Sequence, residues 1–194
     1  LCISITSAGI ELALSRCVAK EISLGQKKRA QFFLYISIIL SLSISCIIAV
    51  IIPPNATFLS IYVLGDLRCE QLLSILVYAL PFASIHSCIC GYYLGSHYAN
   101  VYAYSQLIEQ FFRVGSIFLL CKFYSSNIIY AVYGIVISEA VSSLFCLNYF
   151  LRKESFHKDS SLQFRIIPMC TELFSLAGPI TLNKLLTNLL HSAE

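Results

Sequence analysis

Charged residues are scarce in this sequence of 194 residues, since Asp, Glu, Lys and Arg together make up only 12% of it. Hydrophobic residues make up 58%, and the mean hydropathy is +0.78. Soluble globular chains contain roughly 25% charged and about 45 to 50% apolar residues. A soluble domain could not bury this much apolar surface, so the composition excludes that class and predicts an integral membrane protein.

Motifs for catalysis and cofactor binding are also lacking. The sequence has no cluster of metal ligands at a usual spacing, no P-loop, no nucleophile elbow and no acidic pair at catalytic spacing. None of its nine cysteines forms a CxxC pair, and most lie in apolar stretches, where cysteine behaves as a small hydrophobic residue. We therefore expect no enzymatic activity, no metal site and no cofactor beyond a coupling to H⁺, Na⁺ or the membrane potential.

Long apolar stretches are what the sequence has instead. They lie at residues 1–24, 31–52, 72–96, 101–123, 128–151 and 171–194. A helix that spans a bilayer needs about 20 mostly apolar residues, and each stretch has that length. The runs are too long, and alternate too little, for strands of a membrane barrel. We predict an all-α fold, a polytopic transmembrane bundle of about six spanning helices in contact with membrane lipids.

Two connections between these stretches are longer than the others. Residues 53–71 begin with Pro53 and Pro54, which should end the second helix because proline lacks a backbone donor and clashes with the preceding turn. Residues 152–170 are the most polar part of the chain. The chain opens on Leu1 within one apolar stretch and stops at Glu194 within another, so we expect a fragment of a longer protein.

Lys and Arg are concentrated in two connections, which four helices separate. These residues are Lys20, Lys27, Lys28, Arg29, Arg152, Lys153, Lys158 and Arg165. The connections on the opposite face offer only Arg68 and Lys122. Because cytoplasmic loops hold an excess of Lys and Arg, we place the two basic connections in the cytoplasm. Their positions account for the net charge of +3, so no nucleic-acid partner is expected.

A few polar side chains interrupt the apolar stretches, where a charge costs a few kcal/mol near the bilayer centre. In the segment SQLIEQFFR, Glu109 and Arg113 are four residues apart and can pair on one helical face. The pair is expected to fix helix packing as a buried ion pair, to line a transport cavity, or to do both. Other interruptions include Glu11, Arg16, Gln106, Gln110, Glu139, Lys184 and Asn188.

This mixed-charge interior suits the passage of a polar or anionic solute. Arg16, Arg113 and Lys184 could bind phosphate, since guanidinium and ammonium groups bind it strongly where water is excluded. Gly91 and Gly95 form a GxxxG pattern, which indicates close helix packing or a turn. A lone histidine such as His86 or His191 is more often a packing residue with its polar groups satisfied than a ligand.

Three segments in order resemble one family of membrane proteins, the stage V sporulation protein B-like polysaccharide exporters. Residues 9–30 (GIELALSRCVAKEISLGQKKRA) are similar to its second helix and the following cytoplasmic turn. Residues 91–114 (GYYLGSHYANVYAYSQLIEQFFRV) carry its G-Y-x-x-G turn and its S-Q-x-x-E-Q-x-x-R pattern. Residues 176–194 (LAGPITLNKLLTNLLHSAE) are similar to the first helix of its second half. Glu11 departs from the family, which usually has a small or apolar residue there.

The resemblance implies membership of the multidrug, oligosaccharidyl-lipid and polysaccharide flippase superfamily, with two lobes around a cavity that opens to alternate sides. This chain would then be helices two to seven. Residues 1–168 would form most of the first lobe, and residues 169–194 would begin the second. The implied substrate is a polyprenyl-pyrophosphate-linked oligosaccharide in the cytoplasmic membrane of a bacterium.

The resemblance also implies roles for the polar residues. Arg16, Arg113 and Lys184 would grip the pyrophosphate. Glu11, Glu109 and Glu139 would be ion-pair partners or coupling groups, and Gln106, Gln110 and Asn188 would line the polar cavity.

Two other functions stay open at this point. A cation-coupled multidrug antiporter would depend on a carboxylate such as Glu109 or Glu139, whereas a flippase should depend on Arg16 or Arg113. A non-transporting membrane scaffold or decayed fragment would show no transport defect when Arg16, Arg113 and Lys184 are all changed to alanine.

Overall fold

The computed structural model describes residues 2–61, 69–123, 128–153 and 166–193. Within them the chain is helical and contains no strand. The long helices are α1 (Cys2–Ser23), α2 (Lys27–Ile51), α5 (Leu80–Gly95), α6 (Ala99–Phe123), α7 (Ile128–Lys153) and α8 (Ile166–Ala193). The short elements are the 3₁₀ turn η1 (Pro53–Asn55), α3 (Ala56–Leu59), α4 (Cys69–Leu76) and the 3₁₀ turn η3 (Val77–Ala79). The predicted all-α bundle is confirmed.

Proline and glycine set the ends of α1 and α2, as the local sequence requires. α2 ends at Ile51, directly before Ile52 and the Pro53–Pro54 pair, which confirms the expected stop. α1 ends at Ser23, and Gly25 then adopts a φ of +75°, which costs glycine little because it has no Cβ. The Gly25 N–H donates to the Ile22 carbonyl at 2.9 Å, which closes the last turn.

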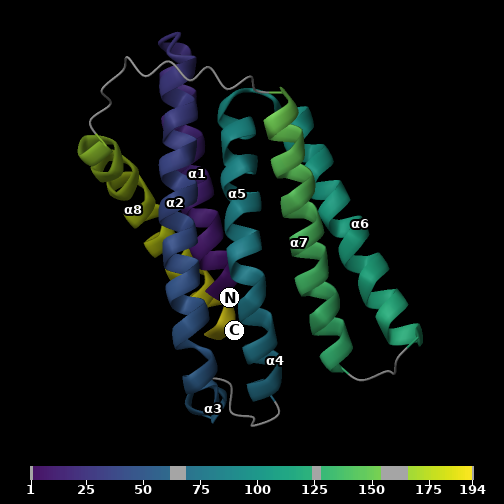
Figure 1. The fold of residues 1–194 in the computed structure, drawn as a ribbon. Coiled ribbons are helices and arrows are strands. Elements are labelled where there is room, and N and C mark those ends of the chain that lie inside the picture. Colours follow the sequence, from purple (N-terminus) through teal and green to yellow (C-terminus); the bar gives the residue numbers. More distant parts are fainter. Residues whose placement is uncertain (1, 62–68, 124–127, 154–165, 194) are drawn as a thin grey trace.

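α5 is the central helix of the bundle. It packs against α1 and α2 on one side and against α6 and α7 on the other, and the chain reverses direction between successive long helices (Figure 1). The largest core cluster lies mainly where α1, α2 and α5 meet, and Leu14, Phe33, Leu34 and Ile89 are among its fully buried side chains. α5 therefore links both halves of the bundle.

Gly91 and Gly95 let α5 approach the backbone of α1. A Cβ at Gly91 would lie 2.7 Å from the Glu11 carbonyl oxygen, and one at Gly95 would strike the Ser15 carbonyl oxygen. Only glycine fits at both points without movement of one helix. The GxxxG pattern is confirmed as a site of close helix packing.

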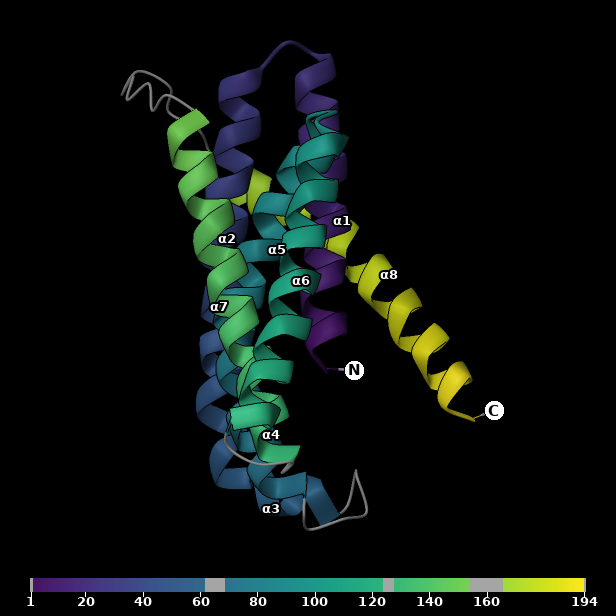
Figure 2. The same ribbon diagram turned by 90° about the vertical axis from the view of Figure 1, so that its right-hand side faces the viewer.

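α8 crosses the bundle at an angle instead of running alongside it. It packs on α1 and touches α2, and its C-terminal half leaves the other helices (Figure 2). A Cβ at Gly9 would strike the side chain of Thr181, so α1 and α8 cross closely there. Lys20 Nζ lies 2.5 Å from Glu172 Oε1, which adds an exposed ion pair between the two helices.

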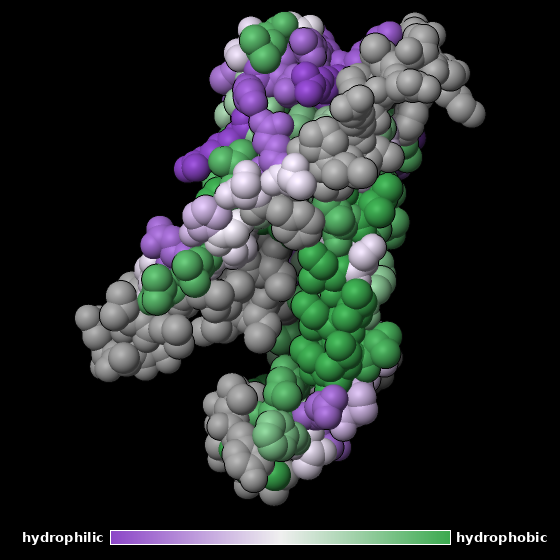
Figure 3. All heavy atoms as spheres, turned by 90° about the vertical axis from the view of Figure 1, so that its left-hand side faces the viewer, coloured by the Kyte–Doolittle hydropathy of each residue, from purple (hydrophilic) through white to green (hydrophobic). Residues whose placement is uncertain are grey.

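The outer surface suits a lipid environment. Figure 3 shows a hydrophobic surface over the middle of one face and hydrophilic residues gathered toward the end that carries the α1–α2 turn. Three segments of the described chain are long and apolar enough to cross a membrane, namely Lys27–Leu59, Cys69–Gly95 and Ile128–Lys153. The helices α1, α6 and α8 have 22, 25 and 28 residues but carry more of the polar and charged side chains. The protein is therefore a helical membrane protein with a partly polar interior.

Most of the basic residues that the structure describes lie at one end of the bundle. α2 begins with Lys27 and Lys28 directly after the α1–α2 turn, and α7 ends with Arg152 and Lys153 at the same end (Figure 1). Lys122 lies in the last turn of α6, at the opposite end. Lys153 Nζ also lies 4.4 Å from the centre of a tyrosine ring in the α5–α6 turn, that of Tyr98. Arg68, Lys158 and Arg165 lie outside the described residues.

Candidate functional site

A buried charge network joins α6 and α7. Glu109 and Arg113 lie one turn apart on α6, and Arg113 Nη2 donates to Glu109 Oε1, as the spacing predicted. The same Nη2 donates to Glu139 Oε1 on α7 at 2.6 Å. Both carboxylate side chains are only 9% exposed, and that of Arg113 is 29% exposed. One guanidinium thus holds two carboxylates from different helices.

His86 extends this network to α5. Its Nδ1 lies 3.4 Å from Glu109 Oε2, the carboxylate oxygen that Arg113 Nη2 does not contact. Glu109 therefore lies between the imidazole and the guanidinium. The sequence predicts a packing residue with its polar groups satisfied at His86, and the structure shows it buried with Glu109 beside it. Through this contact α5, α6 and α7 share one polar centre.

The charges of this network do not cancel. Arg113 contributes one positive charge and the two carboxylates contribute two negative charges, so the network carries a formal net charge of −1 when His86 is neutral. The Nε of Arg113 is buried and makes no hydrogen bond within the described residues. A buried N–H without an acceptor costs free energy. The Nε–H of Arg113 can therefore still gain a favourable hydrogen bond to an added acceptor.

Glu11 and Arg16 lie apart from this network. Glu11 on α1 is half-buried and hydrogen-bonds with Tyr102 on α6. Arg16 is exposed and follows Ser15, whose carbonyl lies against Gly95. His86 and Gly95 are nine residues apart on α5, so Arg16 and the Arg113 network lie at levels about 13 Å apart along its axis.

The remaining four predicted residues lie on α6 and α8. Gln106 is half-buried and Gln110 is exposed, both on α6 near Glu109. Lys184 and Asn188 belong to α8, and their side chains lie outside the described part of the structure. The structure thus brings together Glu109, Arg113 and Glu139, and the roles of all nine residues in transport stay predictions.

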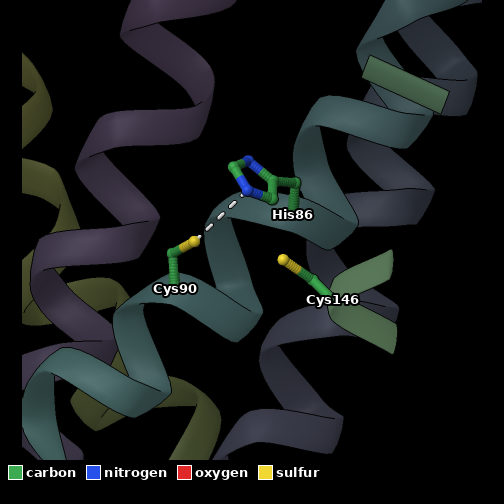
Figure 4. A group of neighbouring side chains, drawn as sticks. All are labelled: His86, Cys90 and Cys146. Carbon is green, nitrogen blue, oxygen red and sulfur yellow. Dashed lines mark hydrogen bonds between the residues drawn. The ribbon is translucent and has the colours of Figure 1, made fainter. Parts of the chain in front are cut away.

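A second cluster beside the network has no counterpart in the sequence motifs. His86 and Cys90 are one turn apart on α5, and Cys146 of α7 directs its sulfur toward them (Figure 4). Cys90 Sγ lies 3.4 Å from His86 Nε2 and 3.1 Å from Ser105 Oγ. The spacing of four residues between His86 and Cys90 indicates that they share one helical face. Cys146 joins them only through the packing of α7 on α5.

An apolar cavity of about 260 Å³ adjoins this cluster, between α5, α6 and α7. Its polar lining includes Cys90, Ser105 and Cys146, and its aromatic lining includes Tyr93 and Tyr149. None of the seven predicted polar residues whose side chains the structure describes lines this cavity. It is therefore distinct from the transport cavity that the sequence predicts.

The fold and the buried network define a polytopic helical membrane protein with a charged interior. The chain belongs to the family of polysaccharide biosynthesis proteins, whose family model matches residues 1–193. It is similar to the stage V sporulation protein B of Bacillus subtilis (strain 168), with 25% identity over 202 residues. That match covers 97% of this chain and 38% of the relative, so the chain spans about two fifths of the relative's length. No solved structure matches. The resemblance drawn from the sequence motifs is confirmed.

Proposed function

We propose that the protein containing this chain is a flippase that moves a polyprenyl-pyrophosphate-linked oligosaccharide across the cytoplasmic membrane of a bacterium by alternating access. The family match over residues 1–193 carries this proposal. The buried guanidinium of Arg113 supports it, because a cation inside a membrane bundle marks the path of an anionic group. No catalytic step is needed, since the substrate changes side and not structure.

Arg113 is the group proposed to grip the pyrophosphate, and its carboxylate partners control when it can do so. In the described arrangement Glu109 and Glu139 both accept hydrogen bonds from its Nη2. A pyrophosphate can take the guanidinium only if at least one carboxylate releases it. Protonation of one carboxylate would bring the net charge of the network from −1 to zero and weaken that carboxylate's hold. This exchange is a physical route for coupling transport to H⁺.

Arg16 would act at another stage of transport. Its level on α1 is about 13 Å from that of the Arg113 network, so the two cations would meet the substrate at different depths in the bundle. Arg16 lies toward the end of the bundle that carries the basic α1–α2 turn. We propose that this end is cytoplasmic and that Arg16 meets the substrate before Arg113 does.

The placement of α8 supports a two-lobe transporter. It packs on α1 but diverges from the other helices, which suits the first helix of a second lobe (Figure 2). We propose that residues 1–168 belong to the first lobe and residues 169–194 to the second. Lys184 would then belong to the second lobe and offer a further cation for the substrate.

A cation-coupled multidrug antiporter is the second candidate, and one observation favours it. Glu109 and Glu139 are buried carboxylates in the middle of α6 and α7, where such an antiporter binds its coupling ion. In this structure, however, a guanidinium holds both of them. A cationic drug would have to displace Arg113, whereas an anionic pyrophosphate would replace the carboxylates as its partner.

Reconstitution of the full-length protein in proteoliposomes separates these functions. The assay would follow translocation of a fluorescent polyprenyl-pyrophosphate oligosaccharide, and a parallel assay would follow efflux of a cationic dye. The flippase proposal predicts protein-dependent movement of the first substrate and none of the second. Dye efflux alone would establish the antiporter, and movement of neither substrate would favour the scaffold.

A further inference from the structure

The thiol and imidazole groups beside the charge network form a set of metal ligands. His86 Nε2, Cys90 Sγ and Cys146 Sγ lie within 4.8 Å of one another, and all three residues are buried. We propose that these residues bind one Zn²⁺ ion, which ties α5 to α7. Neither the family nor the proposed transport function assigns such a site.

The distances fit a zinc centre closely. With Zn–S bonds of about 2.3 Å and a Zn–N bond of about 2.0 Å, tetrahedral geometry separates two sulfurs by about 3.8 Å and a nitrogen from a sulfur by about 3.5 Å. Cys90 Sγ and His86 Nε2 already lie 3.4 Å apart. The other ligand atoms need to move by about 1 Å at most, which side-chain rotation of Cys146 can supply.

Glu109 is placed to orient the imidazole for a metal. Its Oε2 lies 3.4 Å from His86 Nδ1, so a small movement would let the Nδ1–H donate to the carboxylate while Nε2 keeps its lone pair toward the sulfurs. A carboxylate behind a metal-binding histidine is the usual way in which proteins orient this ligand. The cluster thus has three metal ligands and a carboxylate that can orient one of them.

The charges select zinc among the metals that prefer thiolates. Thiolate and imidazole ligands suit Zn²⁺ and Cu⁺. Two thiolates and a neutral imidazole cancel the charge of Zn²⁺, whereas they leave one negative charge on a Cu⁺ centre. In a buried site beside a network of net charge −1, the neutral centre costs less. The two thiol protons leave to water when the metal binds.

The fourth position of the zinc faces the cavity between α5, α6 and α7. That cavity, of about 260 Å³, is lined by Cys90, Ser105 and Cys146. It has room for a water molecule as the fourth ligand, and Ser105 Oγ lies 3.1 Å from Cys90 Sγ.

Metal analysis of the full-length protein tests this proposal. The protein would be purified under reducing conditions with a tag that does not bind metals, stripped with a chelator, and titrated with Zn²⁺ and with Co²⁺ as a coloured probe. We expect one ion per chain and thiolate-to-cobalt charge transfer. Cys90→Ser and Cys146→Ser should each abolish the charge-transfer band or weaken binding at least tenfold, and Glu109→Gln should weaken it about 10- to 100-fold.

Cys88→Ser is the matched control, because Cys88 is equally buried on α5 but belongs to no ligand cluster among the described residues. It should bind metal as the unmodified protein does. Gel filtration and circular dichroism would confirm that each variant is folded. If a ligand variant fails to fold, X-ray absorption at the zinc edge of the unmodified protein decides the matter, since two sulfur ligands are expected.

Three results would overturn the proposal. The first is an absence of bound zinc, or a zinc edge without sulfur ligands. The second is copper in place of zinc in protein purified without added metal. The third is a disulfide between Cys90 and Cys146 in protein kept under reducing conditions, detected by mass spectrometry, because a disulfide would remove both thiolates.

Discussion

Arg113 on α6 and Glu139 on α7 are joined by a hydrogen bond of 2.6 Å between Nη2 and Oε1. Because Glu109 accepts from the same nitrogen, removing Arg113 leaves two buried carboxylates facing each other, whereas removing Glu139 leaves Arg113 with a partner. The two residues are therefore unequal in their effect on stability.

We expect Arg113→Met to destabilise the protein more than Glu139→Gln does. Removing one partner of a buried ion pair costs about 3 to 5 kcal/mol. Since Arg113 is 29% exposed, a loss of about 2 kcal/mol is expected for Arg113→Met, and less than half of that for Glu139→Gln. Thermal unfolding followed by circular dichroism in detergent would measure both. Equal losses would mean that Glu109 does not hold Arg113 in solution.

The α1–α5 crossing gives a second prediction. Gly95→Ala should destabilise the protein by about 1 to 3 kcal/mol, because the new methyl group would strike the Ser15 carbonyl and the two helices would have to separate. Gly115→Ala on α6 is the matched control, since no atom lies within 4 Å of the added Cβ there. The control should be neutral or stabilise the helix by up to about 1 kcal/mol. If both variants unfold at the same temperature, α1 and α5 do not pack as described.

The sidedness of the bundle is a third prediction. We expect a cysteine at Arg152 to be shielded from a membrane-impermeant maleimide in intact cells, and a cysteine at Lys122 to react with it. These positions lie at opposite ends of the bundle, at the ends of α7 and α6. A parent protein without reactive cysteines provides the background. Labelling of Arg152→Cys from outside would reverse the proposed orientation.

Sequence reasoning predicted the helices and one part of the site. Glu109 and Arg113 could be paired in advance because a spacing of four residues places side chains on one helical face. Glu139 could be named as a buried carboxylate but not assigned to Arg113, because that contact depends on how α7 packs on α6. The same limit hid His86, whose neighbour Glu109 comes from another helix.

The cysteines show this limit in another form. Cys90 and Cys146 read as small hydrophobic residues within apolar stretches, and their burial agrees with that reading. Only the packing of α7 against α5 places their sulfur atoms near His86. Ligands from separate helices have no fixed spacing in the sequence, so no motif could have added Cys146 to the pair His86 and Cys90.

The most direct test of the proposed function measures translocation of the polyprenyl-pyrophosphate oligosaccharide by Arg113 variants of the full-length protein in proteoliposomes. We predict that Arg113→Gln lowers the rate at least tenfold, that Arg113→Lys keeps part of the activity, and that Arg152→Gln, which removes the same charge at an exposed position, leaves the rate unchanged. Unimpaired translocation by a folded Arg113→Gln protein would contradict the account.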